Sequence, residues 1–155
     1  MGIVSYRQAD KSDVPAMARI REEGGWEGGA PADRMTAYLD GRHHPQHALV
    51  PRIIYVAHEG DAPVGYIAGH LTRRYACDGE LEWLYVVPER RRSAVASELL
   101  RLLATWFAGQ KASRICVDVE PSNTVARHFY AWHGASELNP HWLVWSDIRT
   151  VLGGQ

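Results

Sequence analysis

The chain has 155 residues, of which 46% are hydrophobic, so we expect one domain spanning residues 1–155 around one core. Its 17 Lys and Arg nearly balance its 18 Asp and Glu, which excludes the strong positive field of a nucleic-acid-binding protein. Two cysteines without CxxC spacing indicate neither a disulfide framework nor a zinc site. With no signal segment and no membrane-spanning apolar run, we expect a cytoplasmic protein that does not bind membranes. A homodimer is a further possible state.

The N-terminal part is expected to form one strand and two helices. Weak alternation predicts a strand from Ile3 to Arg7. Asp10 is a suitable N-cap for a helix that ends near Glu23, and Pro31 and Gly41 are suitable first and last residues of a shorter helix.

The segment from Trp26 to His47 is the least regular part of the chain. Trp26 either packs between helices or covers a substrate, and we favour packing because large aromatic side chains are mostly buried. The histidines of the RHHPQH stretch, His43, His44 and His47, suggest a metal site. A polar loop with a proline and no acidic or cysteine partner provides little fixed geometry, so we predict a solvated loop and no metal.

The middle of the chain is predicted to form three neighbouring strands and a helix. Apolar, β-branched runs at Arg52–Ala57 and Pro63–Leu71 are joined by a short turn, as in a hairpin. A third strand covers Gly79–Val87. Apolar residues at helical spacing then predict a helix from about Arg91 to Ala108.

The C-terminal part continues with a strand, a helix and a hairpin. The strand Ser113–Val119 follows a helical crossover, so it should lie parallel to the strand before that helix. Ser122 or Asn123 caps the next helix, and Ala135–Leu138 and His141–Ile148 form the hairpin. The element order predicts an α/β (α+β) domain with a mixed sheet.

The stretch from Leu84 to Leu100 reads as a strand, a tight loop and a helix start. The first amides of a helix have no intrahelical partner and lie at the positive end of its dipole, so this unit can bind a pyrophosphate. The side chains of Ser93, Ala94 and Ala96 are small enough to let phosphates approach. An ordinary helix start with solvated arginines is the alternative.

The same stretch resembles the cofactor loop of the GNAT superfamily of acyl-CoA-dependent N-acyltransferases. The family pattern of Gln or Arg, two residues, Gly, one residue, and Gly or Ala corresponds to Arg91-Arg92-Ser93-Ala94-Val95-Ala96, with alanine in place of the first glycine. The stretch Asn123 to Gly134 resembles the second cofactor-facing segment, in which Asn, Ala, Tyr and Gly recur. The resemblance spans essentially the whole chain.

The resemblance implies a mostly antiparallel sheet of about seven strands with about four helices, and two parallel strands that splay apart around acetyl-CoA. The cofactor-binding residues it implies are Tyr85, Val86, Val87, Arg91, Arg92, Ser93, Ala94, Val95, Ala96, Asn123 and Tyr130. It also implies an N-acetyltransferase that acts by direct attack of a primary amine of a small molecule or peptide. A catalytically silent acyl-CoA-binding regulator is the alternative that Ala94 suggests.

Candidate catalytic residues are Tyr130, Glu80 and Glu82. Tyr130 matches the family tyrosine that protonates the departing thiolate, although it can also be a core tyrosine, and the Val86 amide can stabilise the oxyanion. Strand alternation places Glu80 and Glu82 on one face, with Leu81, Trp83 and Tyr85 on the other.

Mutual repulsion would raise the pKa of one of these carboxylates, so either can be the base, and the family position favours Glu80. Alternatively, both are solvated or paired with Arg73 or Arg74. Cys116 reads as a small buried hydrophobe and not as a nucleophile.

Overall fold

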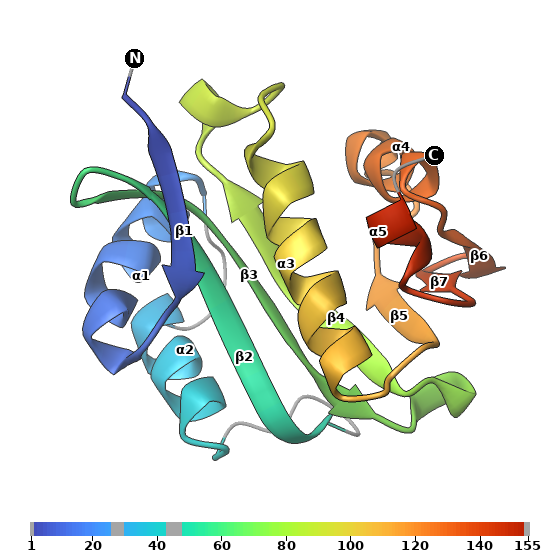
Figure 1. Ribbon diagram of the computed structural model, residues 1–155. Helices are drawn as coiled ribbons and strands as arrows, with labels where there is room; N and C mark the ends of the chain where they lie inside the picture. Colours follow the sequence, from blue (N-terminus) through green and yellow to red (C-terminus); the bar gives the residue numbers. More distant parts are fainter. Residues whose placement is uncertain (1, 26–29, 43–47, 154–155) are drawn as a thin grey trace.

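The computed structural model describes residues 2–25, 30–42 and 48–153 (Figure 1). Trp26 and the histidines at 43, 44 and 47, for which we predicted packing and a solvated loop, lie outside the described residues.

A single sheet runs through the molecule in the order β1-β2-β3-β4-β5-β7-β6 (Figure 1). The strands are β1 (Val4–Gln8), β2 (Ala48–Glu59), β3 (Ala62–Thr72), β4 (Gly79–Val86), β5 (Ile115–Asp118), β6 (Ser136–Asn139) and β7 (Trp142–Trp145). Every neighbouring pair is antiparallel except β4 and β5. The sheet that the sequence predicted is therefore confirmed, with its one parallel pair after the helical crossover.

Helices cover both faces of the sheet (Figure 1). The α-helices are α1 (Val14–Glu23), α2 (Pro31–Leu39), α3 (Val95–Gly109), α4 (Thr124–Trp132) and α5 (Thr150–Gly153), and short 3-10 turns lie at Lys11–Asp13, Arg74–Ala76 and Pro88–Arg90. One core lies between the sheet and α1 with α2, and the larger core lies under α3. The short α5 is absent from the sequence prediction.

Glycine lets α3 approach the sheet closely. A Cβ at Gly69 of β3 would lie 2.8 Å from Leu103 Cδ1 and 3.2 Å from the Glu80 carbonyl oxygen. Leu103 and Phe107 of α3 are completely buried at this contact. The close packing fixes α3 across β3 and β4, so the start of α3 lies beyond the C-terminal end of β4.

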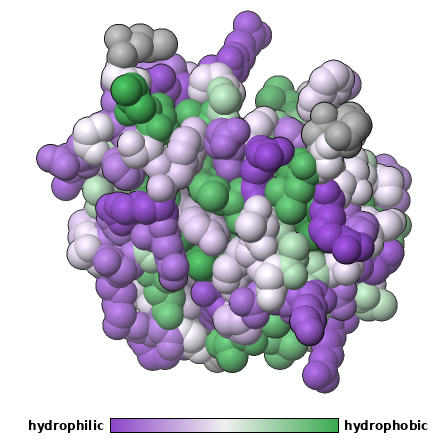
Figure 2. Space-filling view, viewed as in Figure 1, coloured by the Kyte–Doolittle hydropathy of each residue, from purple (hydrophilic) through white to green (hydrophobic). Residues whose placement is uncertain are grey.

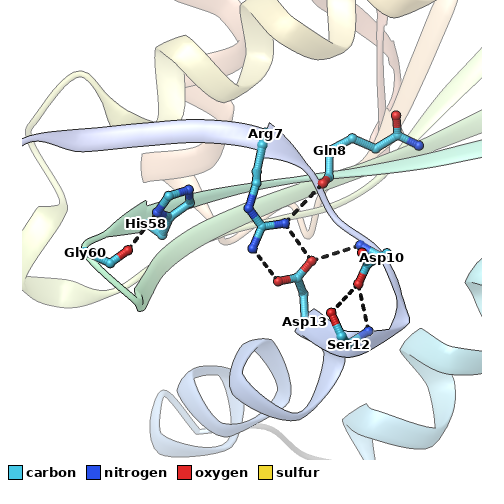
Figure 3. A network of polar contacts seen from close by, with 7 residues as sticks. All are labelled: Arg7, Gln8, Asp10, Ser12, Asp13, His58 and Gly60. Atoms are coloured by element: carbon cyan, nitrogen blue, oxygen red, sulfur yellow. Dashed lines mark hydrogen bonds and ion pairs between the residues drawn. The ribbon is translucent and has the colours of Figure 1, made fainter.

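A polar network joins the end of β1 to the start of α1 (Figure 3). The Arg7 guanidinium donates hydrogen bonds of 2.8 and 2.6 Å to the Asp13 carboxylate, which also accepts the Asp10 amide at 2.9 Å. The side chain of Asp10 in turn accepts the Ser12 amide at 2.8 Å. Asp10 is thus an N-cap, as predicted, but of the 3-10 turn that leads into α1.

The parallel pairing of β4 and β5 is short. Its register contains only Gly79↔Ile115, Glu80↔Cys116 and Leu81↔Val117, although β4 continues to Val86. At the other end, Asp78 Oδ2 accepts the backbone amides of Ser113 (2.9 Å) and Arg114 (3.0 Å). The two strands are therefore held together where they start and separate where they end.

No helix in the described part of the chain is long and apolar enough to cross a membrane. Figure 2 shows hydrophobic groups scattered among hydrophilic ones on the face that carries α3.

Asp78→Ala should lower the free energy of unfolding by about 1–2 kcal/mol, because two backbone amides lose a charged acceptor at an exposed position. Urea denaturation measures this change. Asp61→Ala, which removes an exposed carboxylate from the β2–β3 turn, is the control and should change stability by less than about 0.5 kcal/mol. Equal effects of the two substitutions would show that Asp78 does not hold the strands.

Candidate functional site

Two adjoining cavities occupy the space between the separated ends of β4 and β5. The larger, of about 660 Å³, lies between the β4–α3 loop and α4, and the smaller, of about 320 Å³, lies between the second half of β4 and the end of β5. Both are lined by Leu84, Tyr85, Asn123, Ala126 and Tyr130. Together they form a cleft with two compartments, located where ligands bind in open α/β sheets, beyond the carboxyl ends of strands.

A β-bulge at Glu82 determines which β4 side chains face this cleft. In the β3–β4 ladder Ala68 pairs with Trp83 and Gly69 with Leu81, so Glu82 is an extra residue. The bulge shifts the alternation of the strand by one position.

The faces that regular alternation predicts for the β4 side chains are therefore wrong beyond Leu81. Trp83 packs on Tyr38 of α2, with ring centroids 4.9 Å apart, and thus lies on the same face as Glu80 and Glu82. Regular alternation would place Leu81, Trp83 and Tyr85 together on the other face, but only Leu81 is in the core under α3.

Both glutamates lie beside a fully buried histidine of β3, His70. Its Nε2 atom is 3.5 Å from Glu80 Oε1, and its Nδ1 atom is 3.9 Å from Glu82 Oε1 and 2.8 Å from the Tyr38 hydroxyl. The three donor groups lie within 4.8 Å of one another, a spacing that would also suit a metal ion. The Arg74 guanidinium, 3.5 Å from Glu80, already supplies positive charge there, so we interpret the cluster as a buried ion pair with a second carboxylate beside it.

Glu80 and Glu82 differ in their access to the cleft. Glu80 is only 5% exposed and does not line either cavity, whereas Glu82 lines the smaller one. Burial, and secondly the charge of Glu80, raise the pKa of Glu82 to about 7, against the opposing effect of Arg34 and Arg74. Glu82 is thus a carboxylate that can accept or release a proton near neutral pH.

Tyr130 lies at the junction of the two cavities. Phe129 and Trp145 hold its ring in edge-to-face contacts, with centroids 5.4 and 5.6 Å away. Burial raises the pKa of Tyr130, so its hydroxyl keeps its proton at neutral pH. No described residue forms a hydrogen bond with this hydroxyl, which leaves it available to a ligand.

Asn123 begins α4 and lines both cavities. Its Oδ1 accepts the Ala126 amide at 3.1 Å, so the oxygen caps the helix. The side-chain nitrogen remains as a donor, which makes capping and ligand contact compatible.

The arginine cluster divides into three different environments. Arg90 forms an ion pair with Glu59 and donates to the Gly2 carbonyl at 3.2 Å, so it ties the loop to β2. Arg91 donates from Nε to the Val86 carbonyl at 2.9 Å and lies over the Tyr85 ring. Arg92 is exposed and has a φ of 65°. Only Arg91 and Arg92 can therefore face an anion without breaking an ion pair.

The backbone at Ala94, where the family pattern has glycine, is right-handed helical, with φ −78° and ψ −1°. No glycine is needed there, and the left-handed position of the loop is Arg92. The helix itself begins at Val95 and not near Arg91 as predicted, because the 3-10 turn at Pro88–Arg90 and the left-handed residue precede it.

Most of the predicted cofactor residues line the larger cavity. They are Tyr85, Val86, Arg91, Arg92, Ser93, Ala96, Asn123 and Tyr130. The side chains of Val87, Ala94 and Val95 do not line it, and Val95 belongs to the core. Sequence reasoning did not identify Asp118 and Glu120 in the smaller cavity, although carboxylates at the end of a buried parallel strand are a readable signal.

The family model described as acetyltransferase (GNAT) family matches residues 19–135, whereas no curated protein matches the chain. Among solved structures, a GNAT-family protein from Desulfovibrio desulfuricans is 20% identical, with a TM-score of 0.72 over 88% of this chain and 87% of that chain. The protein yncA from Salmonella typhimurium, solved with acetyl-CoA, is 17% identical, with a TM-score of 0.68 over 91% and 90%. These structures show that the fold is shared.

Arg92→Gly should raise the free energy of unfolding by up to about 1 kcal/mol, because glycine adopts a positive φ without a Cβ clash. Ala96→Gly, in the first turn of α3, is the matched control and should lower it by about 1 kcal/mol. Thermal unfolding of both variants measures the difference. A stability loss in Arg92→Gly as large as that in Ala96→Gly would contradict the left-handed assignment.

Proposed function

This chain belongs to the acetyltransferase (GNAT) family, and we propose that it acetylates a primary amine of a small molecule or a peptide. It is an acetyl-CoA-dependent acetyltransferase. One observation carries the proposal for its chemistry: Glu82 and Tyr130 line the smaller cavity, and Tyr130 and Val86 line the larger one. A proton acceptor, a proton donor and a backbone donor therefore surround one connected space.

The larger cavity suits acetyl-CoA, the donor of the acetyl group. The first-turn amides of α3 lie at the positive end of the helix dipole. In the cavity wall the side chains of Ser93 and Ala96 are small, and Arg91 and Arg92 add positive charge. Because the Val87 amide bonds to Val64 of β3 at 2.9 Å, the backbone groups of Val86 point the opposite way, into the cleft. The Val86 carbonyl already accepts Arg91 Nε at 2.9 Å, so the pantetheine arm of acetyl-CoA can pair with this strand edge chiefly through the Val86 amide.

Glu82 is the residue that we propose as the base. An amine acceptor is mostly protonated at neutral pH and must lose a proton before it can attack the thioester. The pKa of Glu82, near 7, lets its ionised form take this proton directly or through a water molecule. Glu80 does not line either cavity, so we do not propose it as the base. Its charge instead raises the pKa of Glu82.

Val86 and Tyr130 serve the later stages of the reaction. The Val86 amide can donate to the thioester oxygen as negative charge develops on it. The Tyr130 hydroxyl can give its proton to the departing thiolate of CoA. Glu82 thus takes one proton from the acceptor ammonium group, the C–N bond forms by attack on the thioester carbon, and the C–S bond then breaks. Tyr130 protonates the departing thiolate, and the second proton that the nitrogen loses returns to the Tyr130 oxygen, directly or through water.

A catalytically silent acyl-CoA-binding role was suggested by alanine at position 94. The helical backbone of Ala94 removes the reason for expecting weak binding, because only a left-handed position requires glycine.

Calorimetry should show CoA binding to the wild type and roughly tenfold weaker binding to Ala94→Asp, because its charge repels the phosphates at close range. Ala94→Asn has the same shape without the charge and should bind like the wild type. Thiol release from acetyl-CoA is measured in parallel on a panel of amines. Binding without turnover would support the silent role, and equal affinity of the two variants would place the phosphates elsewhere.

Glu82→Gln should lower kcat/KM near pH 7 by about 10²-fold or more and recover activity at high pH, where the amine deprotonates itself. The wild-type profile should rise with pH through an inflection near 7, the pKa of Glu82. Ionisation of Glu82 costs folded stability as the pH rises from its ordinary pKa to about 7. Glu82→Gln should therefore be more stable than the wild type above this range, which separates lost catalysis from unfolding.

Glu80→Gln is the matched control for this profile. Loss of the Glu80 charge should lower the pKa of Glu82 and move the inflection to lower pH, with the maximal rate retained. A wild-type profile in Glu82→Gln would refute Glu82 as the base.

Tyr130→Phe should reduce kcat about 10²-fold or more with nearly unchanged CoA affinity, since only the proton donor is lost. Tyr55→Phe, which removes a hydroxyl from a half-buried tyrosine of β2 that lines neither cavity, is the control and should retain wild-type kcat. Full activity of Tyr130→Phe would assign Tyr130 a packing role alone.

A further inference from the structure

The smaller cavity has an excess of negative charge. Three carboxylates line it, those of Glu82, Asp118 and Glu120, and among the described residues Arg21 is the one basic side chain in its wall. The Arg21 guanidinium lies over the Tyr85 ring, 4.9 Å from its centroid. The cavity volume of about 320 Å³ suits a small molecule.

Asp118 and Glu120 are available to a ligand. Asp118 is the last residue of β5 and Glu120 is two residues further, so both side chains can project from the same side of the extended chain. Within the described ranges, neither carboxylate forms an ion pair closer than 4.0 Å. Burial and the charge of Glu80 raise the pKa of Asp118, and this effect outweighs the opposing influence of His141 and Arg74.

A tyrosine hydroxyl in the same wall independently indicates a ligand. Tyr130 is only 6% exposed, and its hydroxyl has no hydrogen-bond partner within the described part of the chain. Because polar groups of buried side chains are normally satisfied, this hydroxyl is expected to meet a polar group of a bound molecule.

We propose that the acceptor is an aliphatic diamine or polyamine, with one amine beside Glu82 and a second, charged ammonium group held by Asp118 and Glu120. This inference rests on the proposed N-acetyltransferase function and narrows its substrate. The second ammonium group never reacts, so its attraction to two carboxylates fixes the orientation of the acceptor. An acceptor with a carboxylate near its amine is repelled by the same wall.

The test compares 1,4-diaminobutane with n-butylamine, which has the same chain length and one amine. For the wild type, kcat/KM should be roughly tenfold or more higher for the diamine, because two partly exposed ion pairs each contribute up to about fivefold. Added salt should reduce this preference by screening. The double variant Asp118→Asn/Glu120→Gln should bring the ratio to about 2, the factor expected from two equivalent amines without ion pairing. Most of this loss should be in the KM of the diamine.

Asp61→Asn is the control, because it removes an exposed carboxylate from the β2–β3 turn, and its diamine preference should equal that of the wild type. Wild-type turnover of n-butylamine as efficient as that of the diamine would overturn this inference and leave the acetyltransferase function intact. An unchanged preference in the double variant would also overturn it. If acetyl-CoA is consumed neither with these amines nor with a broader amine panel, the proposed function and the inference are both refuted.

Discussion

The short parallel pairing of β4 with β5 is the constraint on which the rest of the site depends. Asp78 holds the two strands at their start, and the register ends at Leu81↔Val117. On the β5 side, the backbone of β4 has no neighbouring strand from there to Val86, although β3 still pairs with its other side. In most sheets an unpaired edge invites association with another strand; here the edge lies inside a cleft, where a small amide-bearing ligand can use it.

The bulge at Glu82 gives this edge its chemistry. An uninterrupted strand would direct Trp83 and Tyr85 away from the two glutamates, whereas the bulge brings all four to the face of α1 and α2. Glu80 is then buried against His70 and Arg74, and Glu82 stays at the cavity wall. Two carboxylates of similar sequence context thereby acquire different environments, one neutralised by a cation and the other with a pKa near neutrality.

Much of this could be predicted from the sequence, for identifiable reasons. Long periodic segments such as α3 and the β2–β3 hairpin depend on repeated apolar positions, and their existence and order were predicted. The bulge was not, because the alternation of apolar residues continues through Glu82 and only the pairing with Ala68 and Gly69 reveals it. The start of α3 was misplaced because Arg92 adopts a left-handed conformation that is uncommon for arginine. Sequence motifs located the cavity proposed for acetyl-CoA. Asp118 and Glu120, by contrast, share a cavity with Glu82 only through the tertiary structure.

The β4 bulge also constrains how the chain can change during evolution. Removing Glu82 would close the bulge and leave a regular strand with Trp83 and Tyr85 still on the face of α1 and α2, so the fold would be kept while the smaller cavity lost the β4 carboxylate. Inserting one more residue in the strand would require a second bulge or turn every later side chain to the other face. The β2–β3 turn is solvent-exposed and can vary in length. Descendants of this sequence that keep Glu82 should therefore differ in β4 by substitution, while insertions and deletions accumulate in the turns.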